Sequence, residues 1–138
     1  DSSIADGLMA AQEDAGGGLP AFLGVSFTEF SPGRLRAEMQ VKPDLLTPIA
    51  NMHGGALAAV CDHVLGCVCY PHMKRGQWAA TTEFKVNYLA PVSQGVAAVE
   101  AEIVSLTRTT AVVRISIENE GRLVCMAQGT VLIRDPKP

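Results

Sequence analysis

The segment from Gly54 to Tyr70 constrains this chain more than any other, because it offers no polar face. Only Asp62 and His63 interrupt its apolar residues. A helix that is apolar all round is a fully buried helix, and Pro71 suits its end. Because the segment is shorter than the roughly 20 residues that a bilayer needs, we expect the central helix of a globular domain.

Strand-like runs flank this helix. Arg34 to Val41 alternates polar and apolar residues, which predicts a half-exposed strand, and Lys42 to Met52 predicts a loop. After the helix, turn residues separate four further runs at about 79–89, 96–106, 109–118 and 123–133. One helix among strands joined by short connections predicts an α+β fold with the helix laid against an antiparallel sheet.

The length of 138 residues corresponds to one domain. We expect residues 1–18 to form a polar segment containing a short helix, and residues 19–138 to form a single domain. When Gly is counted and Tyr is not, about 56% of the chain is apolar, against about 45–50% in a typical soluble domain. A domain of this size buries only about two thirds of its unfolded surface, so the surplus predicts self-association or an apolar ligand.

Charge and cysteine spacing exclude several classes of protein. The net charge of −3 and the absence of a Lys/Arg cluster argue against nucleic-acid binding, and high hydrophobicity argues against disorder. No secretory leader is recognised. The spacing of Cys61, Cys67, Cys69 and Cys125 fits neither a redox motif nor a zinc site. We therefore expect reduced thiols in a cytoplasmic protein with no metal, no cofactor and no membrane or nucleic-acid partner.

The start of the helix carries the first chemical signal. The pair Gly54 and Gly55 lets the backbone come close to a ligand. The first N–H groups of a helix have no internal partner and carry the positive end of its dipole. Such an end binds an anion, or an oxyanion that develops during a reaction. Simple turn chemistry also explains the glycine pair, and that alternative stays open.

Asp62 carries the second signal. Burying an unpaired carboxylate is costly, so Asp62 must face a partner, water or a substrate, although a structural role also stays open. Nine helical positions separate it from the neighbourhood of Gly54 by about 13 Å and half a rotation. If both act on one carbonyl, the second group therefore comes from another copy of the chain. The neighbours of Asp62 on its helix face are Ala58, Ala59, Leu65 and Gly66. The small residues among them leave space for a second helix or a thin substrate.

Together these residues resemble a known family. His53-Gly54-Gly55, an aliphatic helix and Asp62 are similar to the hotdog-fold acyl-CoA thioesterases of the phenylacetate-degradation (PaaI-like) group, in the 4-hydroxybenzoyl-CoA thioesterase superfamily. The run from Thr81 to Pro91 resembles that family's strand after the helix, and the match covers about residues 19–134. The resemblance implies a long helix wrapped by a five- or six-stranded antiparallel sheet. It also implies a homodimer with interfacial active sites, and pairing of dimers into tetramers.

The resemblance further implies roles for single residues. The Gly54 N–H would polarise the thioester carbonyl, and Asp62 of the facing subunit would act as nucleophile or as general base on water. Thr81 would position that water or assist Asp62, unless it is an ordinary strand residue. His53 would orient the loop more than take part in chemistry. Residues expected to contact substrate are His53, Gly55, Thr47, Glu83, Tyr88 and Arg108.

Two departures from the family pattern concern the site. Many members carry Asn or Gln six residues before the HGG histidine, where this chain has Thr47. Either Asn51 supplies the donor through a rearranged loop, or Thr47 donates its hydroxyl, or the contact is absent. Arg108 follows a Thr where many members have Gly, and it would meet a CoA phosphate or stay solvated. His63 points about 100° away from the acid, which predicts a core or interface residue, and His72 is expected at the surface.

The function predicted from these observations is hydrolysis of an acyl-CoA thioester to a free acid and CoA. A non-catalytic acyl-CoA binding module is the alternative, which Thr47 favours slightly. A hotdog dehydratase or hydratase is weaker, because no histidine can be placed across the site from the acid. The aliphatic helix predicts an apolar acyl or aryl group, whose length stays open.

Overall fold

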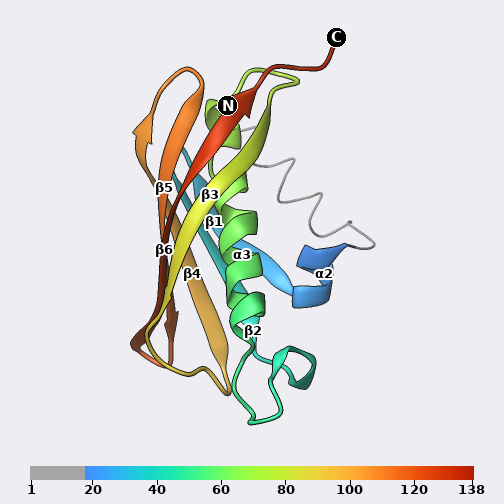
Figure 1. Ribbon diagram of the computed structural model, residues 1–138, viewed down its shortest axis with the longest axis vertical. Helices are drawn as coiled ribbons and strands as arrows, with labels where there is room; N and C mark the ends of the chain where they lie inside the picture. The colour runs from blue at the N-terminus through green and yellow to red at the C-terminus, as the bar shows by residue number, and fades with distance from the viewer. Residues whose placement is uncertain (1–17) are drawn as a thin grey trace.

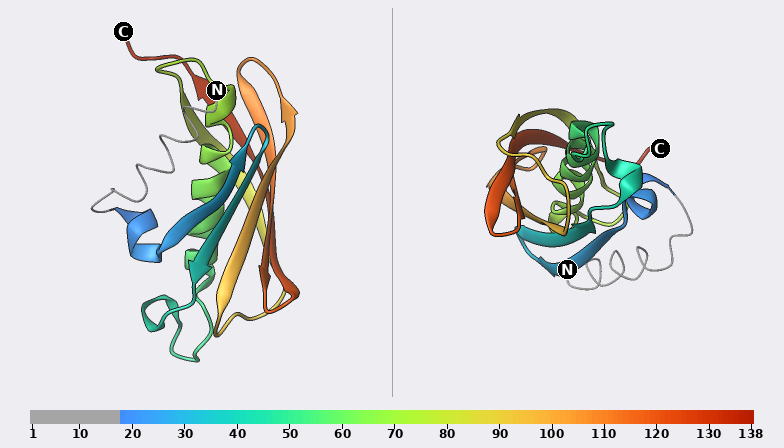
Figure 2. Two further views of the ribbon diagram at one scale, coloured as in Figure 1. Left: turned by 180° about the vertical axis from the view of Figure 1, so that it is seen from behind. Right: turned by 90° about the horizontal axis from the view of Figure 1, so that it is seen from below.

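The computed structural model describes residues 18–138, and the short helix expected nearer the N-terminus lies outside them. One antiparallel sheet of six strands curves around a long helix, α3 (Gly54–Cys67), which lies in the hollow of the sheet (Figures 1 and 2). The strands are β1 (Val25–Ser31), β2 (Arg34–Gln40), β3 (Trp78–Tyr88), β4 (Val96–Leu106), β5 (Thr110–Asn119) and β6 (Arg122–Arg134). Short helical turns are α2 (Leu19–Leu23), η1 (Pro43–Leu45) and η2 (Tyr70–His72).

The order of strands across the sheet is β1-β2-β4-β5-β6-β3, and all neighbours are antiparallel. Helix α3 separates β2 from β3 in the chain, so β3 reaches the far side of the sheet and pairs there with β6. Strands β1 and β3 are therefore the two edges. This topology confirms the predicted α+β class and the helix laid against an antiparallel sheet.

Alternation in the sequence predicts one strand before the helix, whereas the structure has two. Strand β1 was missed because its register shifts between Phe27 and Glu29, where a β-bulge inserts Thr28. An extra residue breaks the period of two on which the prediction depends. The chain turns at Pro32-Gly33 between β1 and β2, and Gly33 adopts a φ of +82° there. The loop expected from Lys42 to Met52 contains the short turn η1.

Helix α3 ends earlier than predicted, at Cys67, and η2 follows after a short turn. Its sheet-facing residues are buried: Leu57, Val60, Cys61, Val64 and Leu65. The other face is open in the single chain, and Asp62 is exposed on it. The expectation of a helix buried on every side is thus wrong for one chain, because a single curved sheet covers only one face.

The core fills the space between α3 and the concave side of the sheet. Its fully buried residues from the sheet include Leu35, Met39, Val113, Ile115, Ile117 and Val131. The segment Gly54–His72 is long and apolar enough to cross a membrane by length and composition alone. The core helix of a globular protein meets this weak criterion as well, and here α3 packs against the sheet.

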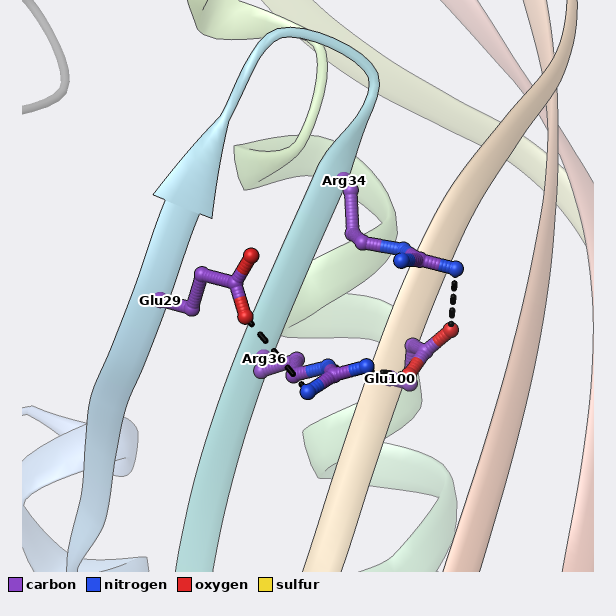
Figure 3. A network of polar contacts seen from close by, with 4 residues as sticks. All are labelled: Glu29, Arg34, Arg36 and Glu100. Carbon is purple, nitrogen blue, oxygen red and sulfur yellow. Dashed lines mark hydrogen bonds and ion pairs between the residues drawn. The ribbon is translucent and has the colours of Figure 1, made fainter.

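The face of the sheet that points away from α3 carries paired charges (Figure 3). Arg36 on β2 lies between Glu29 on β1, at 3.5 Å, and Glu100 on β4, at 3.0 Å. Arg34 adds a contact of 3.1 Å to Glu100. These side chains stay partly exposed, and ion pairs of this kind contribute little to stability. The outer face is therefore a solvated surface, in contrast to the side occupied by α3.

Candidate active site

His53 caps the start of α3. Its Nδ1 accepts a hydrogen bond of 3.0 Å from the Gly55 N–H, and its carbonyl accepts one of 2.9 Å from the Ala56 N–H. The His53 N–H itself donates to the Leu45 carbonyl at 2.7 Å, which ties the motif to η1. Within residues 18–138, the Gly54 N–H has no acceptor. The first turn of the helix is thus satisfied except at the N–H that the sequence singles out.

Tyr88, the last residue of β3, covers the same turn. Its hydroxyl donates a hydrogen bond of 2.8 Å to the Gly54 carbonyl. A methyl group on Gly54 would lie only 3.0 Å from the ring Cζ of Tyr88, so the close approach favours glycine. Loss of water around the phenol raises the pKa of Tyr88, and the nearby thiols of Cys125 and Cys61 add to this. The hydroxyl therefore keeps its proton and remains a donor at neutral pH.

Asp62 lies on the open face of α3. One turn further on, a methyl group at Gly66 would lie 3.9 Å from the Cβ of Ala79 on β3. Because residues four apart share a helix face, Asp62 belongs to the side of α3 that turns toward β3. Its carboxylate is exposed in the single chain, so it faces outward rather than into the core.

His63 points away from the carboxylate toward β1, as its 100° offset predicts. Its ring is half-buried, 5.6 Å from the ring of Phe27, and Cys67 Sγ lies 3.9 Å from its Nδ1. Burial lowers the pKa of His63, and the negative charge of Asp62 opposes that shift. His63 is therefore half-buried beside β1, whereas His72 is exposed.

A bulge in β3 decides which of its residues face α3. The register with β6 shifts between Thr81 and Glu83. Thr81 lies opposite the buried Val131, which puts it on the α3 side of the sheet. Glu83 instead lies opposite Thr130 and accepts a hydrogen bond of 2.6 Å from its hydroxyl, on the outer face. Glu83 thus lies apart from the other predicted substrate contacts, because the extra residue reverses the facing of the strand after it.

One chain brings the predicted residues together in two groups. Helix α3 and strand β3 run in opposite directions, since Gly54 meets Tyr88 while Gly66 meets Ala79. The first group, at the start of α3, is His53, Gly54, Gly55 and Tyr88. The second, Asp62 with Thr81, lies toward the middle of α3, about 12 Å further along the helix axis. Neither group alone holds both a free helix N–H and a carboxylate.

Thr47 and Asn51 close a small loop beside the helix start. The Thr47 N–H donates to the Asn51 carbonyl at 2.6 Å, and the Ala50 N–H donates to the Thr47 carbonyl at 2.9 Å. The Thr47 Oγ1 is buried and finds no hydrogen-bond partner in the described part of the chain. An unsatisfied buried hydroxyl is costly, so this loop offers a donor that a ligand could satisfy.

Arg108 lies at the opposite end of the sheet, in the turn between β4 and β5. The Ile133 N–H donates to the Thr109 carbonyl at 2.8 Å, which brings this turn to the end of β6. Arg134 pairs there with Trp78, and Gln77 bonds Asp135 at 3.0 Å. Four exposed basic residues gather at this end, where α3 terminates: Lys74, Arg75, Arg108 and Arg134. Three of them were not predicted, because they come from separate elements and form no run in the sequence.

The four cysteines are free thiols. Burial raises the pKa of Cys67 to about 12 and that of Cys69 to about 11. Contact with Cys125 and burial raise the pKa of Cys61 as well. Among residues 18–138, no group of three or more His, Cys, Asp or Glu side chains is placed to hold a metal ion. The chemistry that the site offers is therefore an open helix N–H, a carboxylate and hydroxyl donors.

Known proteins share this architecture. The sequence profile of the Thioesterase superfamily matches residues 50–126. The chain is 30% identical over 115 residues to the proofreading thioesterase EntH of Klebsiella pneumoniae, and the match covers 82% of this chain and 84% of that protein. The chain belongs to the thioesterase superfamily.

As a member of this superfamily, the protein is a thioester hydrolase. This thioesterase is also 21% identical over 118 residues to 1,4-dihydroxy-2-naphthoyl-CoA hydrolase of Listeria monocytogenes, covering 85% of this chain and 96% of that one. A solved thioesterase from Haemophilus influenzae superposes with a TM-score of 0.84 at 22% identity, over 90% of this chain and 87% of that one. The structural likeness confirms the hotdog fold.

Proposed function

We propose that this thioesterase hydrolyses an acyl- or aryl-CoA thioester to the free acid and CoA, at a site shared by two copies of the chain. One observation carries the proposal. The open Gly54 N–H and the exposed Asp62 carboxylate lie about 12 Å apart along one helix, too far to act on the same carbonyl. A second copy supplies the missing group.

The reaction uses these two groups in complementary ways. The Gly54 N–H of one copy donates to the thioester oxygen, and the positive end of α3 stabilises the negative charge that develops there. Asp62 of the other copy either takes a proton from the attacking water or attacks the carbonyl carbon itself. Thr81, on the same side of the sheet as Asp62, positions the water. The carbon–sulfur bond then breaks and the CoA thiolate leaves. Where Asp62 is the nucleophile, water then hydrolyses the acyl–Asp62 anhydride, which releases the free acid and restores the carboxylate.

The free edge of β3 supports the dimer. This strand has eleven residues and pairs with β6 on one side only. A long unpaired edge is normally covered, and exposed apolar side chains lie at its two ends, Trp78 and Leu89. Two copies of one strand related by a two-fold axis run antiparallel. The Trp78 end of one copy would then lie beside the Tyr88 end of the other, next to the partner's open helix start, and such dimers would pair into tetramers.

In the same dimer, basic residues would lie where they can bind the CoA part of the substrate. The basic end formed by Lys74, Arg75, Arg108 and Arg134 would lie near the partner's helix start, where it could bind phosphate oxygens. One relative is named as a hydrolase of a CoA thioester. The orphaned Thr47 hydroxyl would serve as a second donor to the carbonyl oxygen, in place of the Asn or Gln that many members carry. On its HGG motif and acid, we assign the chain to the phenylacetate-degradation group.

A panel of aliphatic and aryl CoA thioesters with detection of free thiol tests the function. We expect release of CoA from at least one apolar class, and faster release from aryl thioesters supports the phenylacetate group. Thioesters of the same acyl groups with N-acetylcysteamine, which lacks the phosphates of CoA, test whether the protein recognises the CoA part of the substrate. Replacing Arg108 by Gln should raise KM only for the CoA series, whereas Arg122→Gln at the other end of the sheet should raise neither. No hydrolysis across the panel at high protein concentration would refute the proposed substrate class.

A further inference from the structure

In one peptide group at the start of α3, both the carbonyl oxygen and the N–H form hydrogen bonds with side chains. The carbonyl of Gly54 accepts from the Tyr88 hydroxyl at 2.8 Å. The N–H of the same peptide group, which belongs to Gly55, donates to His53 Nδ1 at 3.0 Å. A peptide group is planar, so two bonds from opposite sides fix its orientation. One bond comes from the local cap, and the other comes from a strand 34 residues away in the chain.

We propose that Tyr88 is a positioning residue that fixes the first turn of α3, so that the open Gly54 N–H faces the substrate oxygen. This inference rests on the proposed function and assigns Tyr88 a task other than the substrate contact expected from the sequence. Hydrogen-bond donors stabilise an oxyanion best when they are oriented before the reaction. The Ala56 and Gly55 N–H groups are already bonded to His53. The Gly54 N–H is therefore the donor of this turn whose direction matters for the substrate.

The surroundings of Tyr88 suit this task. Its ring lies 3.0 Å from where a methyl group on Gly54 would be, so the absence of a side chain at Gly54 lets the tyrosine approach closely. More than half of the side chain is exposed, at 53%, so the fold does not depend on its burial. Tyr88 also ends the free edge strand, which means that pairing of β3 with a second copy would steady the same residue that holds the helix start.

Steady-state kinetics test the role with a conservative change. Tyr88→Phe keeps the ring and removes only the hydroxyl, and the chain's other tyrosine provides the matched control, Tyr70→Phe. We expect Tyr88→Phe to lower kcat about tenfold with KM within about twofold, which is the size of one lost hydrogen bond. Tyr70→Phe should match the wild type. An unchanged kcat, or an effect confined to KM, would overturn the inference and return Tyr88 to substrate binding.

A double-mutant cycle asks whether Tyr88 acts through Gly54. A methyl group on Gly54 would lie 3.0 Å from the Tyr88 ring and 3.2 Å from its hydroxyl oxygen, so Gly54→Ala is expected to disturb this hydrogen bond while keeping the N–H. Adding Tyr88→Phe to Gly54→Ala should therefore lower kcat by less than about twofold, instead of the tenfold expected in the wild type. Full additivity of the two changes would contradict a role through Gly54.

Amide hydrogen exchange tests the positioning without any turnover. Loss of the Tyr88 bond should speed exchange of the Gly55 N–H about fivefold or more in Tyr88→Phe, with no change in Tyr70→Phe. Unchanged exchange in Tyr88→Phe would overturn the positioning role. If the wild type hydrolyses no thioester, the proposed function fails, and the exchange rates still decide whether Tyr88 fixes this turn.

Discussion

The two faces of α3 differ in the size of their side chains and in what covers them within one chain. The sheet-facing side consists of large aliphatic residues and a cysteine that are at most 3% exposed, from Leu57 to Leu65. The open side has small residues, Ala58, Ala59 and Gly66, together with the exposed Asp62. Large side chains fill the core, whereas small ones leave room for a second copy or a ligand. The comparison teaches that side-chain size separates the face that packs on the sheet from the face that is left open in one chain.

The largest effect should come from the open face. Asp62→Asn removes the carboxylate that we propose as general base or nucleophile, so we expect kcat to fall by about 10²–10⁴-fold. Because the side chain is exposed, the thermal midpoint should change little. Thiol release and calorimetry on the same samples measure both. A variant that kept its kcat would remove Asp62 from the reaction.

The sheet-facing side should show the opposite pattern. Leu65 is fully buried, so Leu65→Ala should lower the free energy of unfolding by about 2–5 kcal/mol through lost burial and a cavity. The kcat of the remaining folded protein should stay close to that of the wild type. Leu123→Ala, at a leucine that is 38% exposed, is the matched control and should cost far less. Equal losses of unfolding free energy in the two variants, measured in urea, would show that burial against the sheet does not make Leu65 special.

His63 lies between the two faces and should link stability to pH. Burial lowers its pKa below the ordinary value of 6.5, so the unfolded chain binds a proton first as the pH falls. Stability should therefore be complete above about pH 6.5 and decline as the pH drops toward the folded pKa. His63→Gln should remove this part of the decline in urea unfolding at pH 7 and 5, whereas His72→Gln, at an exposed site, should retain it. A decline that is identical in both variants would place its origin elsewhere.

The smallest effect should come from the ion pairs on the outer face of the sheet. Arg36→Gln breaks contacts to Glu29 and Glu100, yet the side chains are partly exposed, so we expect a cost below about 1 kcal/mol. Added salt should shrink the difference from the wild type in chemical unfolding. The kcat should not change, because this face points away from α3. A marked loss of activity would show that the two sides of the sheet are coupled.

Much of the fold is predictable because its signals are local. Strand β4 has the bounds predicted from a strand-like run between turn residues, and the start of α3 follows from its glycine pair. The bulges at Thr28 and Thr82 are not predictable in this way, because the partner strand decides where an extra residue is inserted. The second bulge is why Glu83 turns to the outer face while Thr81 stays on the side of α3.

The candidate site also combines features that are local in the sequence with contacts between distant segments. Gly54 and Asp62 are recognisable from residue type and spacing within one helix. The bond from Tyr88 to Gly54 is not recognisable, since it exists only because the chain crosses the sheet before β3, and β3 then ends at the start of α3. The orphaned Thr47 hydroxyl likewise depends on how its loop closes. Long-range contacts therefore had to come from the structure.

Mixing two defective variants tests most directly whether one active site takes its groups from two copies of the chain. Asp62→Asn lacks the carboxylate, and Gly54→Pro lacks the N–H while suiting the first position of a helix. His53 already has the extended backbone that precedes proline, and Gly54→Ala controls for displacement of Tyr88. In a mixed dimer one site combines both intact groups, so refolding the two variants together should restore about a quarter of wild-type kcat. Activity no higher than that of either variant alone would contradict a shared site.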